Sequence, residues 1–148
     1  MLQLSSKCMD IARIGIAVGA GLGVMGASIG IVLTSTAYGG FSAKKPESRI
    51  KGIIPLLLAE AIGIYAIVFM MFGLRAIDAG IAADKIFTAG LIFGLGTLGA
   101  GVAIGAAGSG MSLGLAENDR AFIPMLVVVI LAEAIAIYAL VMAIYLMR

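Results

Sequence analysis

The sequence predicts an all-α membrane protein: four transmembrane helices in two tandem, parallel-repeat helical hairpins that assemble into a ring. Three observations predict this. Of the 148 residues, 62% are hydrophobic and only 12% are charged, whereas soluble domains have about 45–50% apolar and about 25% charged residues. Four apolar stretches each reach the roughly 20 residues that a membrane helix needs. The second half of the chain also repeats the first.

The four apolar stretches cover residues 11–37, 53–74, 86–116 and 122–147. Backbone in lipid must satisfy its own hydrogen bonds, which leaves helices or a closed barrel. Barrel strands alternate over about ten residues, and these stretches are too long and too continuously apolar for that. We therefore expect four membrane-spanning helices with both chain ends on one side of the membrane.

Short polar loops join the expected helices. Basic residues are divided equally between the two sides, but the first loop holds the densest cluster: Lys44, Lys45, Arg49 and Lys51. Cytoplasmic loops are enriched in Lys and Arg, so we expect loops 38–52 and 117–121 to face the cytoplasm. The membrane would be the plasma membrane in a prokaryote or an endomembrane, such as that of the vacuole, in a eukaryote.

Residues 1–75 and 76–148 are interpreted as two copies of one hairpin. Residues 58–68, LAEAIGIYAIV, match residues 131–141, LAEAIAIYALV, with an offset of 73. Each copy crosses the membrane twice, so both copies have the same orientation. This is a parallel repeat, unlike the inverted repeats of many secondary transporters.

Glycines recur in the first and third expected helices. Small residues four positions apart let helix backbones approach closely in lipid. We therefore expect these two helices to pack tightly, on the inside of a curved assembly, since a repeated hairpin suits a closed cyclic array. The alternative is ordinary packing within one four-helix bundle. The candidate packing residues are Gly15, Gly19, Gly26, Gly30, Gly90, Gly94, Gly101 and Gly105.

Glu60 and Glu133 are the only acids deep within an apolar stretch. A charge at that depth costs about 2.5–3.5 kcal/mol on insertion scales, so lipid favours the neutral carboxyl, which can carry one proton. The alternative is a carboxyl that only forms a hydrogen bond to a neighbouring helix and carries no proton. This alternative has more weight for Glu60 than for Glu133. Tyr65 and Tyr138 follow the acids by five residues, about 140° around a helix. Each points away from its own Glu, and it either donates a hydrogen bond to the Glu of the other hairpin or only packs.

The composition excludes several other functions. The chain has no His, which excludes a His-based catalytic triad. With Cys8 as the only Cys, we expect no zinc or other metal site and no cofactor. Ten basic and eight acidic residues give a net charge of +2, so there is no electrostatic case for nucleic-acid binding. We expect no catalytic residue in this chain.

The fused hairpins, the Gly-rich first helices and the acids followed by Ile-Tyr resemble the proteolipid subunit of vacuolar and archaeal-type rotary ATPases. The segments 45–55, KPESRIKGIIP, and 130–138, ILAEAIAIY, are similar to this family. The resemblance implies a ring of this chain, alone or with paralogous proteolipids, surrounded by lipid. It implies that Glu133 exchanges protons with a stator subunit that has an essential Arg. It also implies that the loops contact a central stalk and that other subunits hydrolyse or make ATP.

The chain departs from this family in two respects. Members with two fused hairpins often keep the acid only in the second, whereas Glu60 is present here in the first. Sodium-carrying members follow the acid with a Thr-Gln type pair, whereas Ala and Ile follow both acids here and the only Gln is Gln3. We therefore expect protons rather than sodium. The alternatives are a small proton-coupled exporter, which should have more aromatic residues near the acid, and a membrane protein with a purely structural role.

Overall fold

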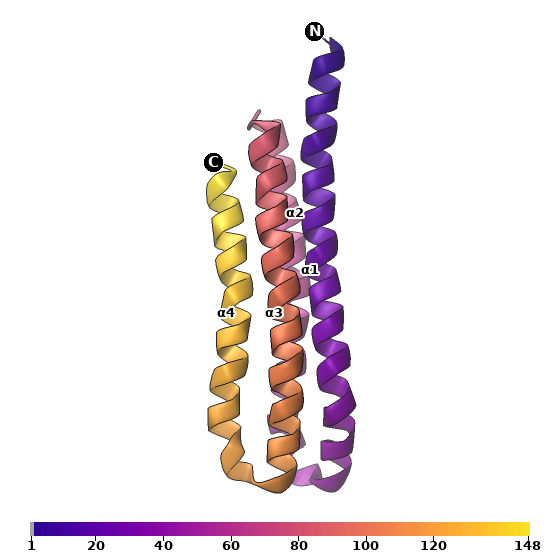
Figure 1. The fold of residues 1–148 in the computed structure, drawn as a ribbon, viewed down its shortest axis with the longest axis vertical. Coiled ribbons are helices and arrows are strands. Elements are labelled where there is room, and N and C mark those ends of the chain that lie inside the picture. The colour runs from indigo at the N-terminus through magenta and orange to yellow at the C-terminus, as the bar shows by residue number, and fades with distance from the viewer. Residues whose placement is uncertain (1) are drawn as a thin grey trace.

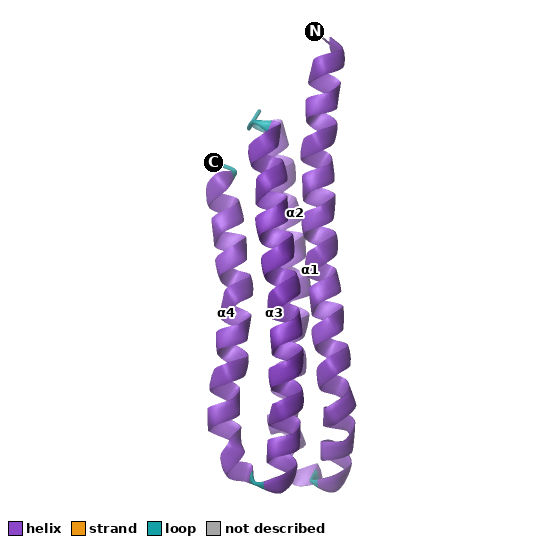
Figure 2. Ribbon diagram, viewed as in Figure 1, coloured by secondary structure: helices purple, strands orange, loops and turns teal. Residues whose placement is uncertain are grey.

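Four long helices run side by side in the computed structural model, which describes residues 2–148 of the chain and side chains from Met9 onward (Figure 1). Two short 3₁₀ turns, η1 and η2, lie in the connections, and the described residues form no strand (Figure 2). The elements are α1 (Leu2–Lys44), η1 (Pro46–Ser48), α2 (Arg49–Asp78), α3 (Ala83–Glu117), η2 (Asp119–Ala121) and α4 (Phe122–Leu146).

All four helices are long and apolar enough to cross a membrane, as the sequence predicts. The sequence predicts a loop over residues 38–52. In the structure, only Lys45 among these residues lies outside a helix or helical turn. A residue that precedes proline is pushed away from helical geometry, and Lys45 precedes Pro46 with φ −130° and ψ 75°. The connection is thus a one-residue break between two helical segments.

The two hairpins have the same orientation. The α1–α2 and α3–α4 connections lie at one end of the molecule, and the chain ends lie towards the other, with the α2–α3 turn (Figure 1). At that turn Gly80 has φ +73°, a left-handed conformation that ends helices at little cost only for glycine. The amide of Ile81 donates back to the Ala76 carbonyl at 3.0 Å, which closes the end of α2.

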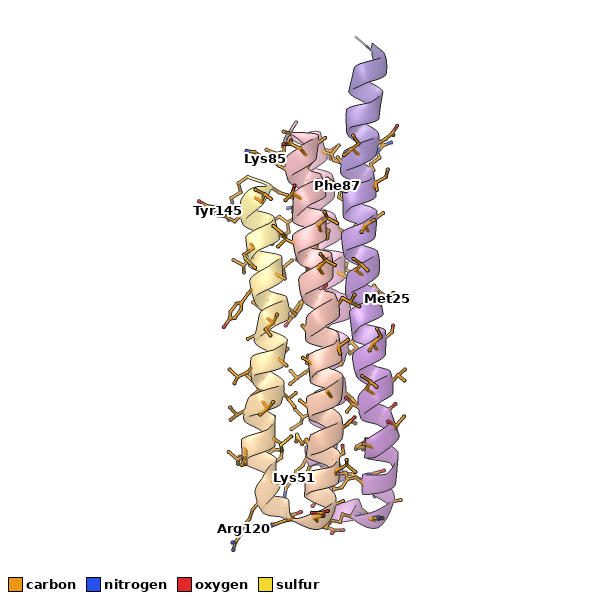
Figure 3. All side chains as sticks on the ribbon, viewed as in Figure 1. Met25, Lys51, Lys85, Phe87, Arg120 and Tyr145 are labelled. Atoms are coloured by element: carbon orange, nitrogen blue, oxygen red, sulfur yellow. The ribbon has the colours of Figure 1, made fainter. Side chains whose placement is uncertain are left out.

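Helices α1 and α3 form the most extensive contact, while α2 packs on α1 and α4 packs on α3. The rings of Phe69 and Phe93 stack where α2 meets α3, with centroids 4.4 Å apart and planes 9° apart. The outer surface is also apolar, and side chains such as Met25 and Tyr145 project from it (Figure 3). So much exposed apolar surface marks a face that meets lipid or other protein rather than water.

Candidate functional site

Glu133 lies on α4 at the contact between the two hairpins and is only 9% exposed. The hydroxyl of Tyr65, on α2, donates a hydrogen bond to Glu133 Oε1. Two neighbours of Glu133 that turn inward on α4 are small: Ala132 is 7% exposed and Ala136 is fully buried. Small side chains let α4 approach the first hairpin, so the Tyr65 hydroxyl can reach the carboxylate.

Tyr65 pairs with the acid of the second hairpin and not with the acid of its own helix. Tyr65 follows Glu60 by five residues, which places the two side chains about 140° apart around α2. Of the two roles that the sequence left open for Tyr65, the structure shows the hydrogen bond across the hairpins.

Glu60 and Tyr138 are in a different situation from Glu133 and Tyr65. Glu60 is exposed on α2, and Tyr138 is 61% exposed on α4. Among residues 9–148, no side-chain hydrogen bond or ion pair joins either one to another group. One chain alone therefore brings together Tyr65 and Glu133 but leaves Glu60 and Tyr138 apart.

Among the other hydroxyl groups of the described membrane helices, Ser109 donates to the Leu33 carbonyl of α1 at 2.6 Å, and the buried Thr34 and Ser112 hydroxyls have no hydrogen-bond partner. Several more donate within their own helix. Ser28 donates to the Val24 carbonyl at 2.9 Å, and Thr97 donates to the Phe93 carbonyl at 2.6 Å. Residues 9–148 contain no cluster of three or more His, Cys, Asp or Glu side chains that could hold a metal ion. Glu133 thus has one polar partner in otherwise apolar surroundings.

The candidate packing glycines line the contact between α1 and α3. A Cβ added to Gly26 would lie 2.5 Å from the Thr97 carbonyl oxygen, and one added to Gly30 would lie 2.9 Å from the Gly101 carbonyl oxygen. Added to Gly101, a Cβ would collide with the carbonyl oxygen of Gly26. The two helices therefore meet backbone to backbone, which fixes the hairpins in the register that aligns Tyr65 with Glu133. The same contact involves Gly15, Gly19, Gly90, Gly94 and Gly105.

A charged cluster at the connection end was not predicted from the sequence. Asp119 accepts from Lys51 at 3.3 Å and lies 3.5 Å from Lys45. Lys45 Nζ also donates to the Leu115 carbonyl at 2.9 Å, and the Ser48 hydroxyl lies 3.4 Å from Asp119 Oδ2. These contacts tie the two connections together. The only sign of this cluster in the sequence is that the two loops contain charges of opposite sign. Those charges do not show which residues meet.

Comparison with known proteins agrees with the repeated hairpin. A family model that describes the C subunit of ATP synthase matches residues 14–72 and again residues 87–146, once in each hairpin. The chain belongs to this ATP synthase C-subunit family. Its matches to the family flank the α2–α3 turn, which confirms the prediction of two tandem hairpins.

Within the family, the chain resembles the V-type proteolipids, as the sequence predicts. It is 34% identical to the V-type proton ATPase 16 kDa proteolipid subunit of Ovis aries and to that of Homo sapiens. Each alignment spans 125 residues, 82% of this chain and 81% of the relative. The protein of the same name from Ascaris suum is 34% identical over 129 residues, 83% of this chain and 80% of the relative. Together with the four apolar helices, this makes the chain a multi-pass integral membrane proteolipid.

Proposed function

We propose that this chain is a rotor-ring subunit of a V-type rotary ATPase and that Glu133 carries protons across the membrane. One observation carries the proposal: a buried glutamate in a membrane helix, held at the contact between hairpins by the Tyr65 hydroxyl. Membership of the ATP synthase C-subunit family and similarity to proteins named as V-type proton ATPase proteolipids support it. The chain performs no chemistry on ATP, which would react on other subunits.

The geometry suits a carboxyl that alternates between two protonation states. A charge at mid-membrane depth costs about 2.5–3.5 kcal/mol on insertion scales, so Glu133 crosses lipid in its neutral form. A hydrogen bond to a charged group contributes about 1.5–3 kcal/mol. The bond from Tyr65 therefore offsets much of the cost while the carboxylate is ionised. An arginine on a static membrane subunit would supply the remaining stabilisation at the point of proton exchange.

The site favours protons over sodium ions. A bound sodium ion needs several oxygen ligands, whereas among residues 9–148 the Tyr65 hydroxyl is the one side-chain oxygen bonded to Glu133. Ser28 and Thr97 use their hydroxyl groups within their own helices. Ala134 and Ile135, which follow the acid, offer no side-chain oxygen.

The packing suggests how copies would be arranged in the ring. We place α1 and α3, whose glycines allow the closest backbone contact, on the inside, and α2 and α4, which bear the acids, on the lipid side. The loop cluster around Asp119 would face the cytoplasm and the central stalk. Neighbours in the ring would be further copies of this chain or paralogous proteolipids.

The experiment is ATP-driven acidification of vesicles that contain the assembled ATPase. Glu133→Gln keeps the size and hydrogen-bonding capacity of the side chain but cannot ionise, so we expect proton uptake to fall to background. The matched control is Asp84→Asn, which removes an exposed acid in the first turn of α3, at the end away from the two connections, and should leave uptake unchanged. Uptake at the wild-type rate with Glu133→Gln would rule out Glu133 as the carrier.

A further inference from the structure

Two stacked aromatic rings lie one helical turn from Tyr65. Phe69 follows Tyr65 on α2 by four residues, so the two side chains lie on the same face of the helix. The Phe69 ring stacks on the ring of Phe93, which comes from α3, and both rings are fully buried. Tyr65 thus lies one turn from a contact that joins α2 to α3, while its hydroxyl reaches across to Glu133 on α4.

A notch in α1 receives the edges of these two rings. It is formed by Gly19 and Gly23, which are four residues apart and so lie on one face of α1. A Cβ added to Gly19 would lie 2.7 Å from Cε1 of Phe69, and one added to Gly23 would lie 3.0 Å from Cε1 of Phe93. The stack is therefore enclosed by three helices, and a ring that slides or tilts would collide with backbone or with the other ring.

The stack is not part of the repeat that relates the two hairpins. Residues of α2 and α4 correspond with an offset of 73, and Gly19 and Gly94 set an offset of 75 for α1 and α3. With these offsets, aliphatic residues occupy the corresponding positions: Met142 for Phe69, Val18 for Phe93 and Leu98 for Gly23. The hairpin architecture itself therefore does not require the stack. The stack lies at the contact that also brings Tyr65 to Glu133.

We propose that Phe69 and Phe93 are positioning residues: their stack sets the rotation of α2 about its axis and so holds the Tyr65 hydroxyl on the Glu133 carboxyl. The assignment rests on the proposed function, in which Glu133 is the working acid. A hydrogen bond weakens steeply when its angle falls below about 120°. The hydroxyl lies at the far end of the tyrosine ring, so a small rotation of α2 displaces it further than it displaces the helix backbone.

The Phe69 ring suits this role better than the small inward residues of α2. Phe69 and Phe93 have the two largest of the fully buried side chains in residues 9–148. A large flat ring between a second ring and a glycine notch admits few rotations of its helix, because interiors are closely packed. Ala59 and Ala66, which are also buried on α2, are small enough to pack at several rotations.

Substitutions that remove a ring but fill its site test this role. Phe69→Met leaves a flexible apolar side chain, the residue that the repeat has at the corresponding position, so we expect the bundle still to form. Phe93→Leu removes the other ring and should have the same effect. The matched control is Phe72→Met, the same change on the same helix at a residue that is 41% exposed and outside the stack.

Carbodiimide, which reacts with protonated carboxyl groups in lipid, reports the effect at Glu133 in the assembled protein. Tyr65→Phe removes only the hydroxyl and frees the carboxyl, so we expect labelling of Glu133 to be about fivefold faster, the ratio for one ordinary hydrogen bond. Phe69→Met should speed labelling in the same direction, and it should add nothing in a chain that already has Tyr65→Phe. A residue that only stabilises the bundle would change labelling equally with and without the Tyr65 hydroxyl. Labelling of Glu60 is the internal reference and should not change.

Two results would overturn the positioning role. One is wild-type labelling of Glu133 in Phe69→Met. The other is an effect of Phe69→Met that is undiminished in the Tyr65→Phe background. Absence of any labelling at Glu133 in the wild-type protein would instead refute the proposed function, so the two failures are distinguishable.

Crosslinking tests the rotation of α2 without relying on the state of the carboxyl. In a Cys8→Ser background, Tyr65→Cys is combined with Glu133→Cys, and a bifunctional thiol reagent is chosen whose spacer joins this pair within one chain. We expect the internal crosslink to form more slowly when Phe69→Met is added and at an unchanged rate when Phe72→Met is added. Equal rates in the two chains would show that the stack does not set the rotation of α2.

Discussion

Substitution of Gly26 by alanine should separate α1 from α3. The new Cβ would lie 2.5 Å from the Thr97 carbonyl oxygen and 2.9 Å from the Leu98 Cα. Ordinary contact begins at 3.4 Å, so the backbones must move apart by about 0.9 Å. Backbone atoms cannot rotate away as a flexible side chain can, and overpacking of this kind typically costs about 1–3 kcal/mol.

The free energy of unfolding would be measured by SDS titration in mixed micelles, followed by near-ultraviolet circular dichroism. Gly63→Ala is the matched control, because its Cβ would lie 3.8 Å from the Ala27 Cβ, an ordinary contact, also within a membrane helix. We expect Gly26→Ala to lose about 1–3 kcal/mol and Gly63→Ala to lose much less. Equal stability of the two variants would refute the inference that close backbone contact holds α1 against α3.

The packing of α2 against α3 and the loop cluster around Asp119 can each be tested by one substitution. Phe69→Leu removes the stacking on Phe93 and also leaves a fully buried site underfilled. We therefore expect a loss of at least about 0.5–1.5 kcal/mol, the stacking contribution alone, in the same titration. Wild-type stability would show that the stacked rings do not stabilise this contact. Asp119→Asn removes the ion pairs with Lys45 and Lys51, so we expect faster proteolysis of the two connections at low salt and little difference at high salt, because salt screens exposed charges. Faster proteolysis of Asp119→Asn at high salt as well would indicate that Asp119 stabilises the connections by something other than its charge.

The elements of the fold could be predicted because their signals are local. The length of each apolar run specifies a membrane helix, and the repeat specifies two hairpins of the same orientation. The pairing of Tyr65 with the acid of the other hairpin was one of two alternatives left open by the 140° rotation. The structure shows that pairing, with Glu133 as the acceptor.

Contacts between distant segments could not be predicted from one sequence. The helical segments of residues 38–52 reach the connection end and bring Lys45 and Lys51 to Asp119, whereas the sequence showed only charges in two loops. Glu60 and Glu133 have near-identical neighbours in sequence, yet one is exposed and the other is buried. Their difference follows from how the two hairpins pack, since Glu133 lies at the contact between them and Glu60 lies on the outer surface. A local sequence pattern does not specify that packing.

Under the proposed function, the membrane glutamates of this chain carry protons. Carbodiimide labelling of the purified wild-type protein, with and without sodium and resolved by mass spectrometry at each residue, tests it most directly. We expect labelling at both Glu133 and Glu60, at rates that sodium does not alter. Absence of labelling at Glu133 would contradict the rotor function, and protection by sodium at either residue would contradict the assignment of protons.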